Sequence, residues 1–203
     1  MKEEDKDNSF LKEPNEAYDI VDNYTLEDLE KIERKEGYTY ELLDGVICLQ
    51  GAPRVQHEEI VANIIGQLWM YLKGKPCKVF GSKMGYAFME KNVKAHEHSK
   101  INQYVEPDVT VICNSSILKD DGAYGVPTVA IEVTSPSTAK RDYIDKYRIY
   151  EKYGVKEYCI ISIENNMVIS NRLSEQGKYI SEEYSFSDEI PIEALGGFKL
   201  KLV

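Results

Sequence analysis

"AIEVTSPSTAKRDYIDKYRIY", residues 130–150, joins an apolar strand pattern, a turn and an amphipathic helix pattern in one short stretch. Two charged residues interrupt its apolar positions. Glu132 lies within the strand pattern, and Lys146 lies within the aromatic stripe of the helix pattern. A charge that is buried without a partner destabilises the folded state strongly. Both residues therefore need partners from elsewhere in the chain.

The strand patterns suggest where a second charge lies. "PTVAIEVT", residues 127–134, is apolar on both alternating faces, so we expect a strand that is covered on both sides, with Glu132 buried at least in part. "EPDVTVIC", residues 106–113, repeats this pattern with Asp108 at its entry. Two carboxylates at the ends of neighbouring strands repel each other unless a cation lies between them.

The helix pattern offers two interpretations of Lys146. At 100° per residue, Lys146 and Tyr153 flank Tyr150 within the aromatic stripe. In the simpler interpretation, Lys146 extends from the edge of the stripe into water. In the other, it joins Asp108 and Glu132 in one site.

Such a site would have a definite chemistry. Two carboxylates and a backbone carbonyl such as that of Val133 offer oxygen ligands to Mg²⁺ or Mn²⁺. A neighbouring lysine can orient water and stabilise charge on a phosphate. This is the chemistry of phosphodiester hydrolysis.

Turn signals and periodicity predict a single mixed α/β domain over residues 25–203, preceded by an acidic, partly disordered leader over residues 1–24. The strands at 128–134 and 156–162, joined by one helix over 139–153, are expected to be parallel. The other predicted elements are a helix from Thr25 to Gly37, a hairpin around Asp44-Gly45, a helix over 55–74, strands at 78–82, 85–90, 106–114 and 168–173, a loop with a helical turn at 115–125, and a final turn and strand in 190–203.

Composition narrows the possible environments. The net charge is −10, and most of the excess lies in residues 1–36, although residues 73–100 hold seven Lys against two Glu. No apolar run is long enough for a membrane span and no signal peptide is recognisable, so a cytoplasmic protein is expected. The four cysteines have no metal-knuckle spacing and are expected to be buried free thiols, namely Cys48, Cys77, Cys113 and Cys159.

The segments "EPDVTVI" and "VAIEVTSPSTAKRDYIDKYRIYEKYGVKEYCII", with "GYTYELLDGVI", "APRVQHEEIVANIIGQL" and "LGGFKLKL", resemble the Uma-type putative restriction endonuclease family of the PD-(D/E)xK nuclease superfamily. The resemblance covers roughly residues 25–203. It implies a restriction-endonuclease-like core of one helix, three strands, a second helix and a fourth strand, with an extra N-terminal hairpin and C-terminal strands. It also implies a nuclease that uses Mg²⁺ or Mn²⁺.

The resemblance assigns roles to individual residues. Pro107-Asp108 matches the family's PD, and Glu132 matches its (D/E). The motif lysine would fall at position 134, where this chain has Thr134. Lys146 on the following helix matches the family's substitute lysine, with Lys140 as the alternative.

Two further residues are candidates. Glu41 in "YELLDG" matches a family glutamate, which implies that it reaches the metal, and the simpler interpretation is a glutamate at a sheet edge. His57 opens a helix and is a candidate for positioning substrate, the alternative being a polar contact at the helix end.

The leading hypothesis is a metal-dependent endonuclease acting on nucleic acid, DNA in the first instance. Because the chain is acidic, the substrate is expected to be short, single-stranded or presented by a partner. One alternative is an inactive nuclease fold that serves as a binding or assembly module. Another is a structural oligomer, because the 15 Tyr suit interfaces, and a homodimer is compatible with each hypothesis.

Overall fold

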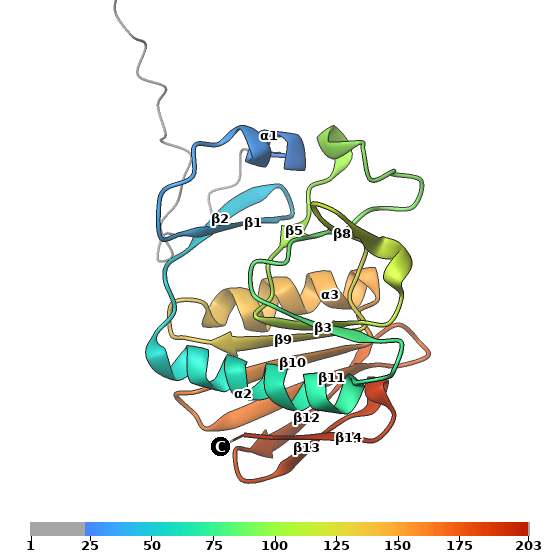
Figure 1. Ribbon diagram of the computed structural model, residues 1–203. Helices are drawn as coiled ribbons and strands as arrows, with labels where there is room; N and C mark the ends of the chain where they lie inside the picture. The colour runs from blue at the N-terminus through green and yellow to red at the C-terminus, as the bar shows by residue number, and fades with distance from the viewer. Residues whose placement is uncertain (1–22, 203) are drawn as a thin grey trace, which may run out of the picture.

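The computed structural model describes residues 23–202. The predicted acidic leader, residues 1–24, lies outside this range except for Asn23 and Tyr24. The chain forms two six-stranded sheets and one two-stranded sheet, with a helix on each face of the central sheet (Figure 1).

The central sheet carries the apolar strands that the sequence predicts, in the order β12-β11-β10-β9-β6-β3. β9 and β10 are parallel, with Glu132 opposite Ile160, as the single crossover helix predicts. β6 runs antiparallel to β9 and β3 antiparallel to β6. The strands are β3 (Lys78–Gly81), β6 (Val109–Ile112), β9 (Val129–Thr134), β10 (Glu157–Ser162), β11 (Met167–Leu173) and β12 (Tyr179–Ser185).

The second sheet contains the predicted hairpin. Asp44 and Gly45 both have positive φ, 49° and 80°, which is the geometry that lets an Asp-Gly pair reverse the chain within two residues. In sheet order the strands are β2 (Val46–Gln50), β1 (Thr39–Leu43), β5 (Tyr104–Val105), β4 (Tyr86–Ala87), β8 (Gly122–Tyr124) and β7 (Leu118–Lys119). A separate hairpin pairs β13 (Glu189–Ile192) with β14 (Phe198–Lys201).

The helices follow the predicted positions, with two changes. α2 spans Val55–Leu72, whereas α1 (Leu26–Lys31) ends before the predicted Gly37. After α1 the backbone is extended at Ile32. The Lys35 N–H donates a hydrogen bond of 2.8 Å to the hydroxyl of Tyr40 in β1, so this segment is bonded to the second sheet and does not continue the helix. The predicted helix over 139–153 is a π-helical segment, η3 (Arg141–Lys146), continued by α3 (Tyr147–Tyr153). Short 3₁₀ turns are η1 (His98–Lys100), η2 (Ser115–Ile117) and η4 (Glu193–Leu195).

The central sheet is covered on both faces, as its apolar strands predict. On one face, Val129, Ile131 and Val133 pack against α2 and the β13–β14 hairpin. On the other, Ala130 packs with α3 and with the second sheet. α3 therefore lies between the two six-stranded sheets, while α2 covers the opposite face of the central sheet (Figure 1).

The order α2, β3, β6, β9, η3–α3, β10 confirms the expected core of one helix, three strands, a helix and a fourth strand. The structure also contains β5, β7, β8, β12 and β13, which the sequence patterns did not predict. Within residues 23–202, no helix combines the length and the apolar character that a membrane span requires.

The expectation of four free thiols is wrong for two cysteines. Cys77, just before β3, and Cys113, just after β6, form a disulfide, because the antiparallel pairing of these strands sets Lys78 opposite Ile112. Cys48 and Cys159 are buried and free, as expected.

We expect reduction of the Cys77–Cys113 disulfide to lower the free energy of unfolding by about 2–4 kcal/mol, because the bond restricts a long loop in the unfolded chain. Urea unfolding with and without a thiol reductant measures this. The double variant Cys77→Ser/Cys113→Ser is the control and should not respond to the reductant. Alkylation of four thiols in the unfolded, unreduced protein would show instead that no disulfide exists.

Candidate active site

The two central carboxylates come from neighbouring strands. Asp108 lies just before β6, and Glu132 lies in β9. Val109 pairs directly with Ile131. Asp108 and Glu132 are the next residues on the two antiparallel segments, so they lie at the same part of the sheet. The expected proximity of the two acids follows from the antiparallel register of β6 and β9.

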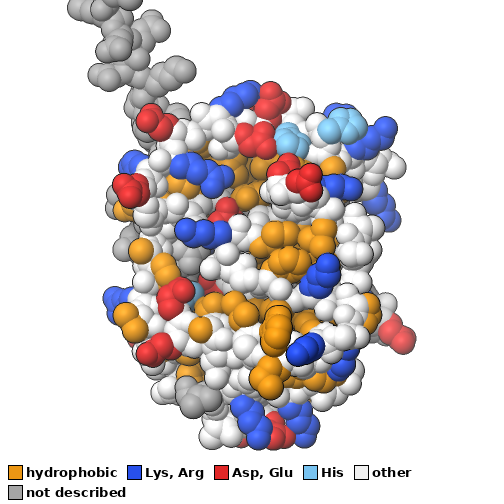
Figure 2. Space-filling model, in the orientation of Figure 1, with side chains coloured by type: hydrophobic (Ala, Val, Ile, Leu, Met, Phe, Trp, Pro, Cys, Tyr) orange, Lys and Arg blue, Asp and Glu red, His pale blue; other side chains and the backbone are white. Residues whose placement is uncertain are grey.

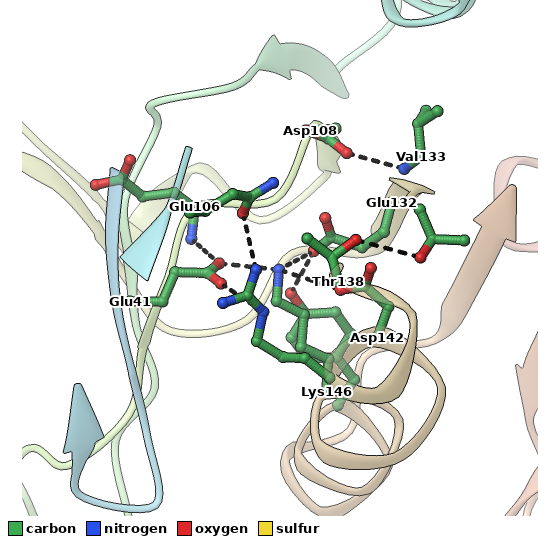
Figure 3. A network of polar contacts seen from close by, with 12 residues as sticks. Glu41, Glu106, Asp108, Glu132, Val133, Thr138, Asp142 and Lys146 are labelled. Carbon is green, nitrogen blue, oxygen red and sulfur yellow. Dashed lines mark hydrogen bonds and ion pairs between the residues drawn. The ribbon is translucent and has the colours of Figure 1, made fainter. Parts of the chain in front are cut away.

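Lys146 does not extend into water. Its side chain is 1% exposed, and its Nζ lies 2.7 Å from Glu132 Oε1, 2.9 Å from Glu41 Oε1 and 3.9 Å from Asp142 Oδ1. Figure 3 shows Lys146 pointing from its helix toward Glu132, with Glu41 approaching from the second sheet. The interpretation of Lys146 as a lysine at the edge of the stripe is therefore wrong.

The helical wheel placed Lys146 beside Tyr150, and both side chains contact Glu132, although the segment that ends at Lys146 is π-helical. A wheel at 100° per residue assumes α-helical turns, whereas η3 is wound with wider turns up to Lys146. Asp142 and Lys146 both lie in η3 and both are buried. Single π-helical turns inside helices are frequent at functional sites.

Glu41 occupies the middle of the second sheet, because β1 is bonded to β2 on one side and to β5 on the other. The interpretation of Glu41 as a sheet-edge residue is therefore wrong. Its side chain is 0% exposed, and its Oε1 accepts the Glu106 N–H at 2.9 Å. Its Oε2 lies 3.8 Å from Arg141 Nε and accepts no hydrogen bond within the described residues.

Sequence reasoning missed two members of the cluster. The Tyr150 hydroxyl donates to Glu132 Oε1 at 3.1 Å, and the buried Arg141 forms the ion pair with Glu41. A buried tyrosine hydroxyl usually has a partner, so the core position of Tyr150 was a usable signal. Arg141 gave no such signal, because its direction depends on the π-helical winding of η3.

Asp108 is held by two neighbours. Its Oδ2 accepts the Val133 N–H at 2.8 Å and lies 3.2 Å from His57 Nε2. Burial disfavours the charged imidazolium of His57, but its contacts with Asp108 and Glu58 outweigh burial and raise its pKa. His57 thus ties the first turn of α2 to the entry of β6.

The cluster carries more negative than positive charge. Four carboxylates (Asp108, Glu132, Asp142 and Glu41) surround two cationic side chains (Lys146 and Arg141), which leaves a formal excess of two negative charges. Burial raises the pKa of Glu132 well above its ordinary value, although Lys146 opposes the change. The surrounding carboxylates outweigh burial for Lys146 and raise its pKa, so its ammonium stays charged.

This arrangement fits a divalent cation at Asp108 and Glu132. Mg²⁺ is commonly held by one or two carboxylates and keeps several waters. One such ion would balance the formal excess of charge in the cluster. Among residues 23–202, no group of three or more His, Cys, Asp and Glu side chains is arranged as a metal site, so the fit rests on two carboxylates alone.

The remaining candidate, Lys140, lies at the start of η3 and is exposed. Lys146, by contrast, contacts Glu132 directly. The catalytic roles of both lysines stay predictions.

A pocket of about 610 Å³ adjoins the cluster. It is lined by His57 and Val133, the two residues that bond Asp108, and by residues 134–138 after β9. Arg54 and Gln50 line it from the connection between β2 and α2.

The fold and the buried carboxylate–lysine cluster together define the class of protein: a mixed α/β chain with a restriction-endonuclease-like core. The model of the family Uma2, described as "Putative restriction endonuclease", matches residues 26–202. The chain therefore belongs to this family, which confirms the resemblance seen in its sequence.

Two further proteins are similar to this chain. The protein slr1290 of Synechocystis sp. is 22% identical over 165 residues, which cover 81% of this chain and 82% of that protein. The crystal structure of a putative nuclease belonging to DUF820 from Anabaena variabilis superposes with a TM-score of 0.68 at 17% identity, covering 87% of this chain and 94% of that one. The second comparison shows that the fold is shared.

We expect Lys146→Met to lower the free energy of unfolding by about 3–5 kcal/mol at pH 7, because it leaves buried carboxylates without their cation. Lys152→Met on the same helix removes an exposed pair with Glu90 and should cost about 1 kcal/mol or less. Urea unfolding measures both variants. Equal losses would show that the buried ammonium has no special role.

The loss caused by Lys146→Met should depend on pH. A buried Glu132 without its cation has a folded-state pKa above its ordinary value of 4.5, so it destabilises the fold as pH rises through that raised pKa. The pKa of Glu132 is already raised in the native protein, and removal of Lys146 raises it further, so the difference between variant and native protein should be smallest at low pH, where Glu132 is neutral in both, and should grow as pH rises. A difference that stays constant with pH would contradict this.

We expect Asp108→Asn to lower the pKa of His57, because it removes the contacts that raise that pKa most. NMR titration of the imidazole signals measures it, and the chain has only three His to assign. Glu58→Gln removes the weaker contact and should lower the pKa less. A larger effect of Glu58→Gln would contradict the geometry at Asp108.

Proposed function

We propose that this chain is a metal-dependent nuclease that hydrolyses phosphodiester bonds of nucleic acid. The observation that supports it best is the ammonium of Lys146, held 2.7 Å from Glu132 on the strand beside Asp108. Membership of a family described as "Putative restriction endonuclease" and the fold shared with a putative nuclease support the same class. Metal dependence, catalysis and DNA as the substrate belong to the proposal.

Each residue has a role in this proposal. Asp108 and Glu132 would hold Mg²⁺ or Mn²⁺, with the Val133 carbonyl as a further oxygen. The cation supplies Lewis acidity that polarises a phosphodiester and acidifies water. Lys146 offsets the negative charge that develops on the phosphate.

Other residues hold the proposed cation ligands and Lys146 in position. The Tyr150 hydroxyl and Lys146 both bond Glu132 Oε1, which fixes the direction of that carboxylate. His57 and the Val133 N–H fix Asp108 in the same way. Glu41 sets the position of the Lys146 ammonium from the second sheet.

A second candidate is an inactive nuclease fold that serves as a binding module. Lys146 is fully enclosed and already paired with two carboxylates, which is also the arrangement of an ion cluster that only stabilises the fold. This candidate predicts neither Mn²⁺ binding nor cleavage.

The homodimer and the cytoplasmic location stay predictions. The Cys77–Cys113 disulfide bears on location, because disulfides are rare in a reducing cytosol.

Cleavage of labelled DNA and RNA with Mn²⁺ tests the proposal. We expect Asp108→Asn to lower the rate by about 100-fold or more, because it removes a proposed cation ligand. Asp188→Asn, an exposed acid after β12, is the matched control and should cleave like the native protein. Equal rates for the native protein and Asp108→Asn would exclude the proposed centre.

The same proposal predicts metal affinity. We expect Glu132→Gln to abolish Mn²⁺ binding in isothermal titration while the fold stays intact by circular dichroism. Glu157→Gln changes another buried strand glutamate, one that accepts bonds from Ser170 and Ala194, and should leave Mn²⁺ affinity unchanged. Unchanged affinity in Glu132→Gln would contradict the assignment.

A further inference from the structure

The pocket beside the cluster lies where ligands bind in α/β sheets, beyond the carboxyl ends of parallel strands. β9 and β10 are parallel and end side by side, with Thr134 opposite Ser162. Residues 134–138 and Ile163, which follow these ends, line the pocket together with the first turn of α2.

The pocket borders the residues that hold Asp108. His57 and Val133 line it, and both bond Asp108 Oδ2, at 3.2 Å and 2.8 Å. Asp108 is 6% exposed, whereas Lys146 is 1% exposed. A ligand in the pocket would therefore meet the Asp108 side of the cluster first.

The lining suits a nucleotide. Tyr38 offers an aromatic ring that is 40% exposed, and Pro53 and Pro136 add apolar surface. Gln50 supplies an amide for hydrogen bonds to a base, and Arg54 supplies a positive charge for a phosphate. Pockets of about 300–1,000 Å³ enclose single small ligands, and this one measures about 610 Å³.

The charges around the pocket do not suit a duplex. Arg54 and His57 are its basic residues, while Glu164 lines it and Glu58 and Glu59 are exposed on the same turn of α2. Duplex binding depends on several Lys or Arg contacts to phosphates. On the face seen in Figure 2, Lys and Arg side chains are interspersed with Asp and Glu, without a continuous basic tract.

The first two lysines of the stretch at 73–100, Lys73 and Lys75, do not fill this gap. They follow the C-terminal end of α2, whereas the pocket lies at the N-terminal end of the same helix. An α-helix of 18 residues is about 27 Å long. Lys73 and Lys75 are therefore about that far from the pocket.

We propose that this pocket receives one unpaired nucleotide, with its base against Tyr38 and its phosphate near Arg54 and His57. The preferred substrate is then single-stranded nucleic acid or an unpaired strand end rather than intact duplex. This proposal concerns how the strand binds, and the hydrolysis proposed above would act on the strand after it has bound.

Fluorescence anisotropy tests the pocket directly. The probe is a short fluorescein-labelled oligonucleotide of mixed sequence, single-stranded or annealed to its complement, as DNA and as RNA, in Ca²⁺. We expect the single strand to bind at least about 10-fold more tightly than the duplex. Tyr38→Ala and Arg54→Gln should each weaken single-strand binding about 10-fold, the loss typical of one stacked base.

Matched controls come from β11 and β12, outside the pocket. Arg172→Gln and Tyr184→Ala should change the affinity no more than about twofold. The proposal is overturned if no oligonucleotide binds, if the duplex binds as tightly as the single strand, or if the pocket variants behave like these controls. The DNA and RNA probes show which sugar the pocket prefers.

The two proposals can fail separately. Selective single-strand binding without Mn²⁺-dependent cleavage would leave the pocket assignment standing and exclude the nuclease. Equal cleavage of single strands and duplexes by the native protein, abolished in Asp108→Asn, would support the nuclease and overturn the single-strand preference.

Discussion

The arrangement of the whole site depends on one buried ammonium. Lys146 joins Glu132 in the central sheet to Glu41 in the second sheet, and it does so from the helical segment between them. The apolar contacts between these layers are strong but non-directional. A buried ion pair adds little net stability compared with an apolar core, but it strongly penalises any arrangement that separates its partners. We infer that Lys146 determines how the second sheet and η3 lie against β9.

Much of this fold could be predicted because its core elements are long or strongly patterned. β9 and β10 are apolar on both faces, and a single helix separates them, so their parallel pairing follows from the sequence. The hairpin turn also follows from the sequence, because an Asp-Gly pair such as Asp44-Gly45 readily adopts the positive φ angles that the turn requires. The residue types of the cluster were also recognisable, because a glutamate in an apolar strand and a lysine in an aromatic stripe each require a partner.

The remainder had no local signal. β5 is two residues long, too short to show any periodicity, and tertiary pairing with β1 and β4 defines it. β12 is mostly exposed, so its sequence is polar and does not alternate as a half-buried strand would. Cys77 and Cys113 are 36 residues apart and meet only because β3 pairs with β6. The pairing of Lys146 with Glu41 had no local signal either, because Glu41 comes from the second sheet.

The place of the lysine on a helix has a physical consequence. At position 134 a lysine would lie on β9 itself, two residues from Glu132, and it would be in place as soon as that strand formed. Thr134 instead bonds Thr138 at the start of the next segment, and the ammonium comes from η3. The charge cluster is therefore complete only when η3 packs on the central sheet and the second sheet, which carries Glu41, is docked as well. In a chain that partly unfolds at this helix, Glu132 would lose its ion pair with Lys146, whereas Asp108 would keep its contacts with His57 and the Val133 N–H. The complete candidate site therefore requires that η3 and the second sheet are both docked on the central sheet.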